Sequence, residues 1–465
     1  MSHRSGGVDV IVESVGDSPF CPHGPMLMFE KFCGTDSKGR RFYACSAFRD
    51  RKDCNFFQWA DEKISPEKQL ARDERHKQLE TSVQAEGKRN RRDEFKNLPP
   101  EERALCQTCG KLLLPAERNS HGDGHRVISP VTNDDFKRPT SLFVPLENNK
   151  TYAQYLFGGS SVKFTIDTVR RLGFTKLLCV GTPRIHEEIQ NLRESPTETL
   201  KSLLLDLDHR FEQIWPPELF CRYNMFNHYF FHGRSSEEAF HKFVSKDADE
   251  KLIILMDPPF GGMVEALAST LKKISEAANG SKSDVLCPMF WYFPYFMEKR
   301  ILEACPGLTM LDYKVDYDNH SLFHAGDKGR KEGSPVRIFT NLPPSKVVLP
   351  KTEGYWFCKK CLRYSAPENW HCQKCGSCTS KDGKSYVHCD LCGRCVKPSR
   401  VHCEVCQQCE LADHRCGAVN STGCHVCGAL EHKRRDCPNK SHICRKIQKR
   451  LGEKMPRKIR KSRRK

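Results

Sequence analysis

The segment Lys251-Leu-Ile-Ile-Leu-Met-Asp257-Pro-Pro-Phe260 decides the fold that we expect for this chain. Its apolar run, bounded by Lys251 and Asp257, is typical of a strand that is buried on both faces of a parallel sheet. The two prolines end the strand and fix the backbone that follows it. The segment therefore predicts a buried strand that delivers a carboxylate and an aromatic ring to a rigid loop.

The region around this segment, about 140–348, has the same organisation. Short apolar runs alternate with amphipathic stretches, such as Val264 to Ala278 after the prolines. Strands separated by helical patterns predict a mainly parallel α/β sheet. The expected strands are Lys176–Val180, Ser202–Asp206, Lys251–Met256, Val285–Phe293 and Val336–Thr340.

The composition indicates that only part of the 465-residue chain has an ordinary core. Hydrophobic residues make up 38% and charged residues 29%, and the net charge of +18 favours phosphate-rich partners or acidic membrane surfaces. No apolar run is long enough for a membrane-spanning helix, and the polar start, Met1 to Ile11, predicts no secretory signal. The 26 cysteines are then expected to be reduced thiols, which favours zinc binding over disulfides.

The first cysteine cluster predicts a small zinc module. Three thiolates and one imidazole can complete a tetrahedral zinc shell: Cys21, His23, Cys45 and Cys54. The flanking segments Gly39-Arg-Arg-Phe-Tyr43 and Phe56-Phe-Gln-Trp59 resemble the GRF zinc finger, a β-rich module of nucleic-acid enzymes. The resemblance implies that the aromatic and arginine side chains face single-stranded nucleic acid, by base stacking and phosphate contact.

A second finger follows, with the ligand spacing of a two-Cys two-His site. Its expected ligands are Cys106, Cys109, His121 and His125. Pro115 and Gly122 argue against a regular recognition helix between them. We therefore expect a structural clamp beside the α/β domain and not a module that reads bases.

Residues 358–416 repeat the unit His-Cys-x2-Cys-x2-Cys, and we call this segment the array. An interleaved scheme uses every ligand in four zinc sites: Cys358, Cys361, His371 and Cys378; Cys372, Cys375, His388 and Cys395; Cys389, Cys392, His402 and Cys409; Cys403, Cys406, His414 and Cys416. Such zinc-stapled turns need almost no hydrophobic core. The spacing resembles the cysteine-rich domain of DHHC palmitoyltransferases, but those enzymes need transmembrane helices. We expect the array to be structural and to contact RNA.

The C-terminal segments predict further contacts with nucleic acid. Cys424, Cys427, His432 and Cys437 have the spacing of a zinc knuckle, a module that typically binds single-stranded RNA. The tail 445–465 carries twelve Lys or Arg residues and one Glu. With the two fingers and the array, these ligands predict about seven zinc sites.

The Asp257-Pro258-Pro259-Phe260 motif resembles that of amino methyltransferases that modify N6 of adenine. The N6 lone pair is delocalised into the ring and is a poor nucleophile. An Asp carboxylate and a Pro carbonyl that accept its two N–H groups localise the lone pair and aim it at the methyl donor. Phe260 can stack on the base. The resemblance implies S-adenosylmethionine as the methyl donor.

A methyl donor predicts a cofactor site at neighbouring strand ends. Gly181 ends the first strand but is followed by Thr-Pro, a departure from the usual Gly-rich loop. An acidic residue after the second strand commonly binds the ribose hydroxyls; Asp206 is the first choice and Asp208 the alternative. The other expected cofactor residues are Gln154, Tyr155, Leu156, Phe157, Arg184, Asn224, Met225 and Phe226, together with Asp257.

The order of the modules resembles the zinc-finger CCHC-domain family of animal ribosomal RNA adenine-N6 methyltransferases. The expected domains are a GRF-type finger (15–60), a charged linker or helix (61–103), a two-Cys two-His finger (104–139), a Rossmann-like class I methyltransferase domain (140–348), the array (355–418), a zinc knuckle (422–440) and a basic tail (445–465).

The resemblance implies methylation of one adenosine, single-stranded or in a hairpin loop, in 28S ribosomal RNA. It also implies nucleolar, nuclear and cytoplasmic location, no membrane association and a monomer. Two alternatives remain at this point. One is an inactive multi-zinc RNA adaptor, favoured by the degenerate Gly loop at Gly181. The other is an adenine-N6 methyltransferase that acts on another RNA or on DNA.

Overall fold

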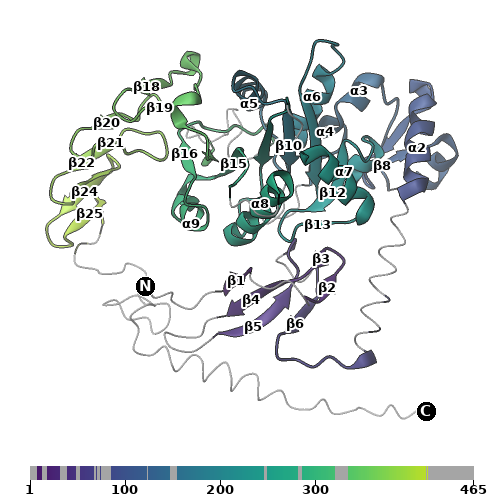
Figure 1. Cartoon of the computed structure of the whole chain (residues 1–465), viewed down its shortest axis with the longest axis horizontal. Coiled ribbons are helices and arrows are strands. Elements are labelled where there is room, and N and C mark those ends of the chain that lie inside the picture. The colour runs from purple at the N-terminus through teal and green to yellow at the C-terminus, as the bar shows by residue number, and fades with distance from the viewer. Residues whose placement is uncertain are drawn as a thin grey trace.

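The computed structural model describes residues 8–12, 18–31, 39–48, 53–67, 70, 74, 85–122, 124–146, 154–245, 249–280, 285–319, 334–414 and 416. The zinc knuckle, the basic tail and Cys33 lie outside these residues. The described residues form a central α/β domain, with the N-terminal finger, residues 8–67, on one side of it and the array beyond one edge (Figure 1). No helix in these ranges is long and apolar enough to cross a membrane.

The central domain is built on an eight-stranded sheet with the order β13-β12-β11-β10-β14-β15-β17-β16. Five neighbouring strands are parallel, namely β12, β11, β10, β14 and β15. The other three, β13, β17 and β16, each run antiparallel to a neighbour. The expected mainly parallel α/β sheet is therefore confirmed. The strands are β10 (Lys176–Val180), β11 (Lys201–Asp206), β12 (Phe220–Asn224), β13 (Tyr229–Phe230), β14 (Leu252–Met256), β15 (Met289–Pro294), β16 (Thr309–Leu311) and β17 (Val336–Thr340).

Helices cover both faces of this sheet because alternate residues of each buried strand point to opposite faces. Leu177 and Cys179 of β10 pack in the core beside α5 and α6, whereas Leu178 and Val180 pack beside α7, α8 and α9. The helices of the domain are α3 (Asn133–Lys137), α4 (Pro139–Leu142), α5 (Gly159–Arg171), α6 (Pro183–Leu192), α7 (Arg234–Val244), α8 (Val264–Asn279) and α9 (Glu298–Ala304).

The N-terminal finger is a β-rich module. β1 precedes the module expected at 15–60, yet it pairs with β4 and completes a four-stranded antiparallel sheet. The strands of this sheet are β1 (Val8–Ile11), β4 (Leu27–Lys31), β5 (Arg40–Ala44) and β6 (Phe57–Trp59), and the hairpin of β2 (Phe20–Cys21) and β3 (Gly24–Pro25) lies beside it.

The second finger shares its core with the central domain. Leu105 and Leu112 belong to the same hydrophobic cluster as the sheet, and the Gln213 side chain exchanges hydrogen bonds with the backbone at Gly110 and Leu112. Its strands are β7 (Ala104–Cys106), β8 (Lys111–Leu113) and β9 (Val127–Ile128). A 3-10 helix, Pro115–His121, lies between its ligand pairs, in agreement with the expectation of no regular recognition helix.

The charged segment before this finger, expected to be a linker or a helix, contains a helix. α2 (Ala85–Asn97) ends against the core, where Phe95 is fully buried and stacks on Phe136. Burial of the Phe95 ring therefore helps to anchor this end of α2 to the core.

The array is a row of four hairpins, each closed by Cys-x2-Cys turns. Its strands are β18 (Trp356–Cys358), β19 (Arg363–Ser365), β20 (His371–Cys372), β21 (Ser377–Cys378), β22 (Val387–Cys389), β23 (Arg394–Val396), β24 (Arg400–Cys403) and β25 (Gln408–Leu411). The first hairpins are anchored to the sheet because buried Asp312, after β16, accepts hydrogen bonds from Ala366 N and Asn369 Nδ2, both at 2.7 Å.

Candidate active site and metal clusters

A cavity of about 570 Å³ opens at the carboxyl ends of the central strands. Gly181, Asp206, Asn224 and Asp257 each stand at or just after a parallel strand, and all four line it. In open α/β sheets, ligands bind in the crevice outside these strand ends. The sequence therefore delivers four of the expected residues to one place.

The backbone at Asp257, directly after β14, is held in a fixed position. Its N–H donates to the carbonyl of Val180 at 3.0 Å, and Pro258 and Pro259 fix the chain after it. The hydroxyl of Tyr317 donates to Oδ1 of Asp257 at 3.0 Å. Burial raises the pKa of the Asp257 carboxyl well above its ordinary value, and the hydrogen bond from Tyr317 opposes this rise. The carboxylate is thus a preorganised acceptor, half-buried in the wall of the cavity.

Aromatic rings stand next to this acceptor. Phe260 lines the cavity, and its ring lies 5.4 Å from that of Tyr155, which also lines the cavity. Flat aromatic surfaces of this kind can hold a planar base by stacking. The geometry supports the expected role of Phe260 beside the Asp257 acceptor.

Gly181 is required where the backbone of two strands converges. Its φ of +67° lies in the left-handed region, and a Cβ atom there would stand 2.9 Å from the carbonyl oxygen of Asp257. A side chain would therefore be strained and would also crowd the Asp-Pro-Pro backbone. A single glycine thus does in this loop what a Gly-rich loop does elsewhere: it lets the backbone approach closely.

Two acidic residues at the end of β11, Asp206 and Asp208, differ in their contacts. Asp208 is buried, forms an ion pair with Arg210 at 2.6 Å and donates its N–H to Oδ1 of Asp206. Asp206 faces the cavity, and its pKa is raised to about 7 by burial and by the negative charge of Asp208. Both carboxylates line the cavity, and because Asp208 is held by Arg210, Asp206 stays the first choice as acceptor for the hydroxyls of a ribose.

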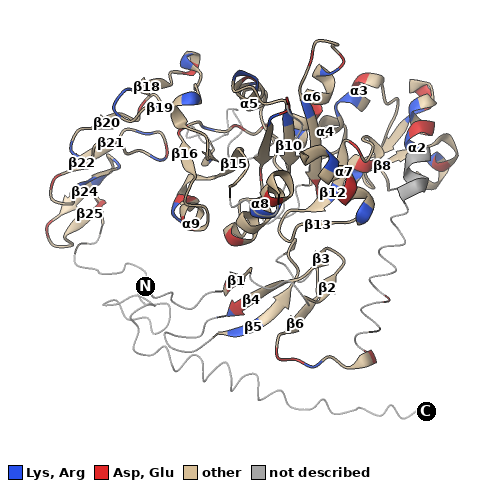
Figure 2. Cartoon of the chain, in the orientation of Figure 1, with Lys and Arg blue, Asp and Glu red and all other residues tan. Residues whose placement is uncertain are grey.

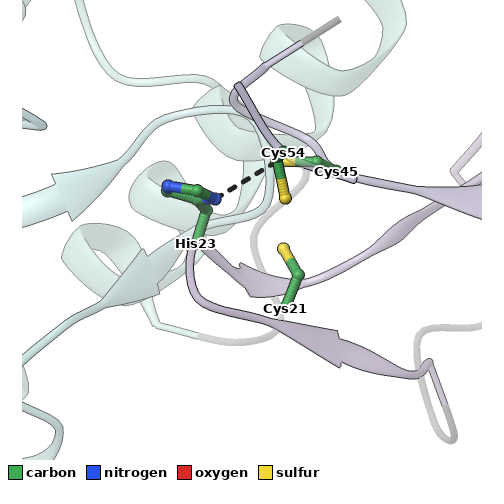
Figure 3. Close-up of side chains that lie close together, drawn as sticks. All are labelled: Cys21, His23, Cys45 and Cys54. Atoms are coloured by element: carbon green, nitrogen blue, oxygen red, sulfur yellow. Dashed lines mark hydrogen bonds between the residues drawn. The ribbon is translucent and has the colours of Figure 1, made fainter. Parts of the chain in front are cut away.

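The N-terminal finger brings its expected ligands together (Figure 3). The ligand atoms of Cys21, His23, Cys45 and Cys54 all lie within 4.8 Å of one another, with His23 Nδ1 3.4 Å from Cys45 Sγ. Three sulfurs and one ring nitrogen at these separations fit the tetrahedral shell of a zinc ion. The same module contributes to the cavity wall through His23, Ala47 and Phe48.

Comparisons with known proteins agree with this geometry. Residues 148–325 match the family described as probable N6-adenine methyltransferase, and residues 19–63 match the GRF zinc finger. The chain is 47% identical over 442 residues to rRNA N(6)-adenosine-methyltransferase ZCCHC4 of Homo sapiens, covering 94% of this chain and 86% of that protein. The proteins of the same name from Xenopus tropicalis and Mus musculus are 51% and 50% identical, over 95% and 94% of this chain and 91% and 86% of theirs.

The chain belongs to the rRNA N6-adenosine methyltransferase family. Membership confirms the class I methyltransferase fold flanked by zinc modules that the sequence predicts. It also makes S-adenosylmethionine the expected cofactor of the central domain. The residues fit this cofactor, since the cavity offers a carboxylate for the ribose at Asp206 and a close backbone approach at Gly181.

Not every residue expected to bind the cofactor of this family lines the cavity. Gln154 and Tyr155 do, but Leu156 and Phe157 are 5% and 2% exposed and pack in the core. Phe157 contacts the rings of Tyr292 and Tyr317 instead. The side chains of Leu156 and Phe157 therefore face the core, because only the start of this segment turns toward the strand ends, and contact of these two residues with the cofactor stays a prediction.

The guanidinium of Arg184, another predicted cofactor residue, has a partner outside the cavity, and its role stays a prediction. Arg184 stands on α6, and its guanidinium pairs with Asp318 at 3.2 Å, outside the lining of the cavity. The first turn of α6 carries the cavity-lining Pro183 on one face and Arg184 on the next, since successive helical residues point about 100° apart.

Asn224 is used for a purpose that the sequence did not indicate. Its buried amide donates to the carbonyl of His23 and to the hydroxyl of Ser46, both at 2.8 Å, and Asn227 donates to His23 and Pro25. This side chain therefore fastens the N-terminal finger to β12. The following Met225 and Phe226 line the cavity, as expected for a cofactor site.

The cavity wall contains residues that sequence reasoning missed altogether. The second finger contributes Gln107, Thr108, Cys109 and Gly110, and the segment after α4 contributes Val144 to Leu146. Cys109 is expected only as a zinc ligand and the other positions carry no motif, so their contact with the cavity follows from how the modules pack. In this family member, both fingers help to form the active-site cavity.

The remaining metal clusters follow the interleaved scheme. Ligand atoms within 4.8 Å of one another group as Cys106, Cys109, His121 and His125, and then as Cys358, Cys361, His371 and Cys378; Cys372, Cys375, His388 and Cys395; Cys389, Cys392, His402 and Cys409. Of the expected last array site, Cys403 lies 3.2 Å from Cys416 and Cys406 lies 3.5 Å from His414. The knuckle ligands Cys424, Cys427, His432 and Cys437 lie outside the described residues.

Proposed function

We propose that the protein transfers a methyl group from S-adenosylmethionine to N6 of one adenosine in 28S ribosomal RNA. The observation that carries this proposal is the Asp257 carboxylate, fixed between a strand and two prolines in the wall of a cavity that also holds Asp206. A carboxylate for an amino group and a carboxylate for a ribose are the two acceptors that this reaction requires.

The residues of the cavity suggest how the transfer is achieved. S-adenosylmethionine supplies a methyl group on a positively charged sulfur, which is already activated for attack. Asp257 accepts one N6 hydrogen, the carbonyl of Pro258 accepts the other, and the lone pair of N6 is directed at the methyl group. Phe260 and Tyr155 hold the plane of the base. Catalysis is then mainly the orientation of two reactants.

The target adenosine has to leave its stack to reach this cavity. Asp257 is half-buried and the cavity is walled by two fingers, so a base within a continuous helix cannot enter it. A single-stranded or hairpin-loop adenosine can be rotated out of its stack with the smallest loss of stacking energy. We therefore propose such an adenosine as the target, a monomer as the active species, and the nucleolus, nucleus and cytoplasm as the locations of the protein.

The decisive experiment is methyl transfer by the purified full chain onto total cellular RNA, followed by mapping of the product. We expect N6-methyladenosine at one position of 28S ribosomal RNA. Methylation of a different RNA or of DNA would overturn the proposed substrate. Tight binding of S-adenosylmethionine without any transfer would instead favour the inactive adaptor.

Deletion of Thr422–Lys465 should weaken RNA binding and make its salt dependence shallower. The Lys and Arg residues of the described ranges are spread over the fingers, the central helices and the array and are not gathered on one element (Figure 2). The deleted segment holds the knuckle and the twelve basic residues of the tail, and fewer neutralised phosphates give a smaller salt slope.

The affinity for S-adenosylmethionine is the internal control of this deletion. The cofactor residues Gly181 and Asp206 lie in the central domain, so calorimetric titration should give the same affinity as the full chain. An unchanged RNA affinity with an unchanged salt slope would reassign the knuckle and tail to protein contact or targeting.

A further inference from the structure

Tyr317 stands behind the acceptor residue, on the core side of the cavity wall. It is 2% exposed and does not line the cavity, although Asp257, Tyr155 and Phe260 do. Its backbone forms a β-bridge with Phe157. The side chain is therefore part of the core, and its hydroxyl reaches the active site from within.

The segment that carries Tyr317 is held on both sides of this bridge. The N–H of Gly158 donates to the carbonyl of Asp316 at 2.8 Å, and the N–H of Asp318 donates to the carbonyl of Leu156 at 2.9 Å. The ring packs against Phe157 at 5.2 Å and Tyr155 at 6.1 Å. The position of the hydroxyl is thus set by packing and backbone pairing and not by the ligand.

The hydroxyl has one partner, the Asp257 carboxylate, at 3.0 Å. Among the described residues, no other side chain donates a hydrogen bond to this carboxylate. Burial and the nearby negative charge of Asp257 raise the pKa of Tyr317 well above its ordinary value, so the phenol stays protonated and acts as a donor. The bond occupies Oδ1 and leaves Oδ2 for a group in the cavity.

We infer that Tyr317 is a positioning residue for methyl transfer, which fixes the rotation of the Asp257 carboxylate so that its other oxygen is presented to the N6 amino group. The inference rests on the proposed function, because it assigns the free oxygen of Asp257 to N6. Without the bond the carboxylate can rotate, and the half-buried anion loses a donor that stabilises it. Both changes weaken the acceptor while leaving the cofactor site as it is.

Tyr317→Phe tests this role through the pH profile of methyl transfer. Only the ionised carboxylate is a strong acceptor, so kcat/KM should fall as the pH drops through the pKa of Asp257. Removing the donor raises this pKa further, and the acid limb should move to higher pH by about one unit, with a kcat about tenfold lower at its optimum. The Kd for S-adenosylmethionine should not change, since Tyr317 does not line the cavity.

Tyr292→Phe is the matched control. Tyr292 is equally buried, packs on the same Phe157 ring and gives its hydroxyl to Thr165 at 3.0 Å, not to Asp257. It should lose a buried hydrogen bond and leave the acid limb where it is. An acid limb that moves equally in both variants, or in neither, overturns the inference.

Two further variants keep the inference testable if Tyr317→Phe folds poorly. Difluorotyrosine at position 317 keeps the ring but is a stronger donor, so the acid limb should move to lower pH. In an Asp257→Asn background the acid limb should be absent, and Tyr317→Phe should change kcat less than in the wild type. A wild-type chain that does not methylate adenosine would refute the proposed function itself, whereas an active chain with an unmoved limb refutes only the role of Tyr317.

Discussion

Asp257→Ala should reduce methyl transfer by about 10²–10³-fold, the range typical for the loss of one preorganised polar group. Alanine cannot accept the N6 hydrogen, and the lone pair of N6 then stays delocalised in the base. The measurement is the single-turnover rate with S-adenosylmethionine and ribosomal RNA. The fold and the zinc content should be unchanged, because Asp257 lies outside every metal cluster found in the described residues.

The graded variant Asp257→Asn separates acceptor strength from shape. The amide keeps one oxygen that can accept a hydrogen bond, so it should retain more activity than alanine and lose the acid limb of the pH profile. Asp167→Ala, a change in an exposed ion pair with Lys163 on α5, serves as the control and should leave the rate as it is. Transfer by Asp257→Ala at a rate near that of the wild type would contradict the assignment of this residue.

Local chemistry explains why the sheet and the motif could be predicted from the sequence. Buried parallel strands are short apolar runs whatever lies around them, and β10 and β17 begin and end at the expected residues. The array was equally predictable, since zinc spacing depends on the turn between two cysteines and little on distant packing. These features are encoded within a few residues of each other.

The sequence is least informative where distant segments meet. Whether Phe157 faces a ligand or the core depends on Tyr317, 160 positions away in the chain, with which its backbone pairs. Asn224 is the last residue of β12, where a cofactor residue is expected, but its amide donates to the N-terminal finger. No periodicity or motif records such contacts, so the fingers' share of the cavity wall emerges only from the folded chain.

The N-terminal finger provides the second large effect, because its fold depends on its metal. Its own hydrophobic cluster is small, and three of its six buried members are the zinc ligands Cys21, Cys45 and Cys54. Because half of this cluster consists of ligand cysteines, the fold around the site depends on the metal. Loss of the ion should therefore release His23, Ala47 and Phe48 from the cavity wall.

Cys54→Ala should therefore lower the zinc content by one ion per chain, from about seven to about six. Methyl transfer should fall by about 10²-fold, since a displaced wall no longer positions the target base. The unfolding transition of the central sheet should persist, because its two hydrophobic clusters do not include this finger.

The control is Cys305→Ala, which changes a buried thiol outside the metal clusters of the described chain. It should keep the full zinc content and most of the activity. If Cys54→Ala lost its zinc yet methylated RNA normally, the finger would have to be a separate binding module and not part of the active-site wall; three or fewer zinc ions in the wild type would refute the interleaved array.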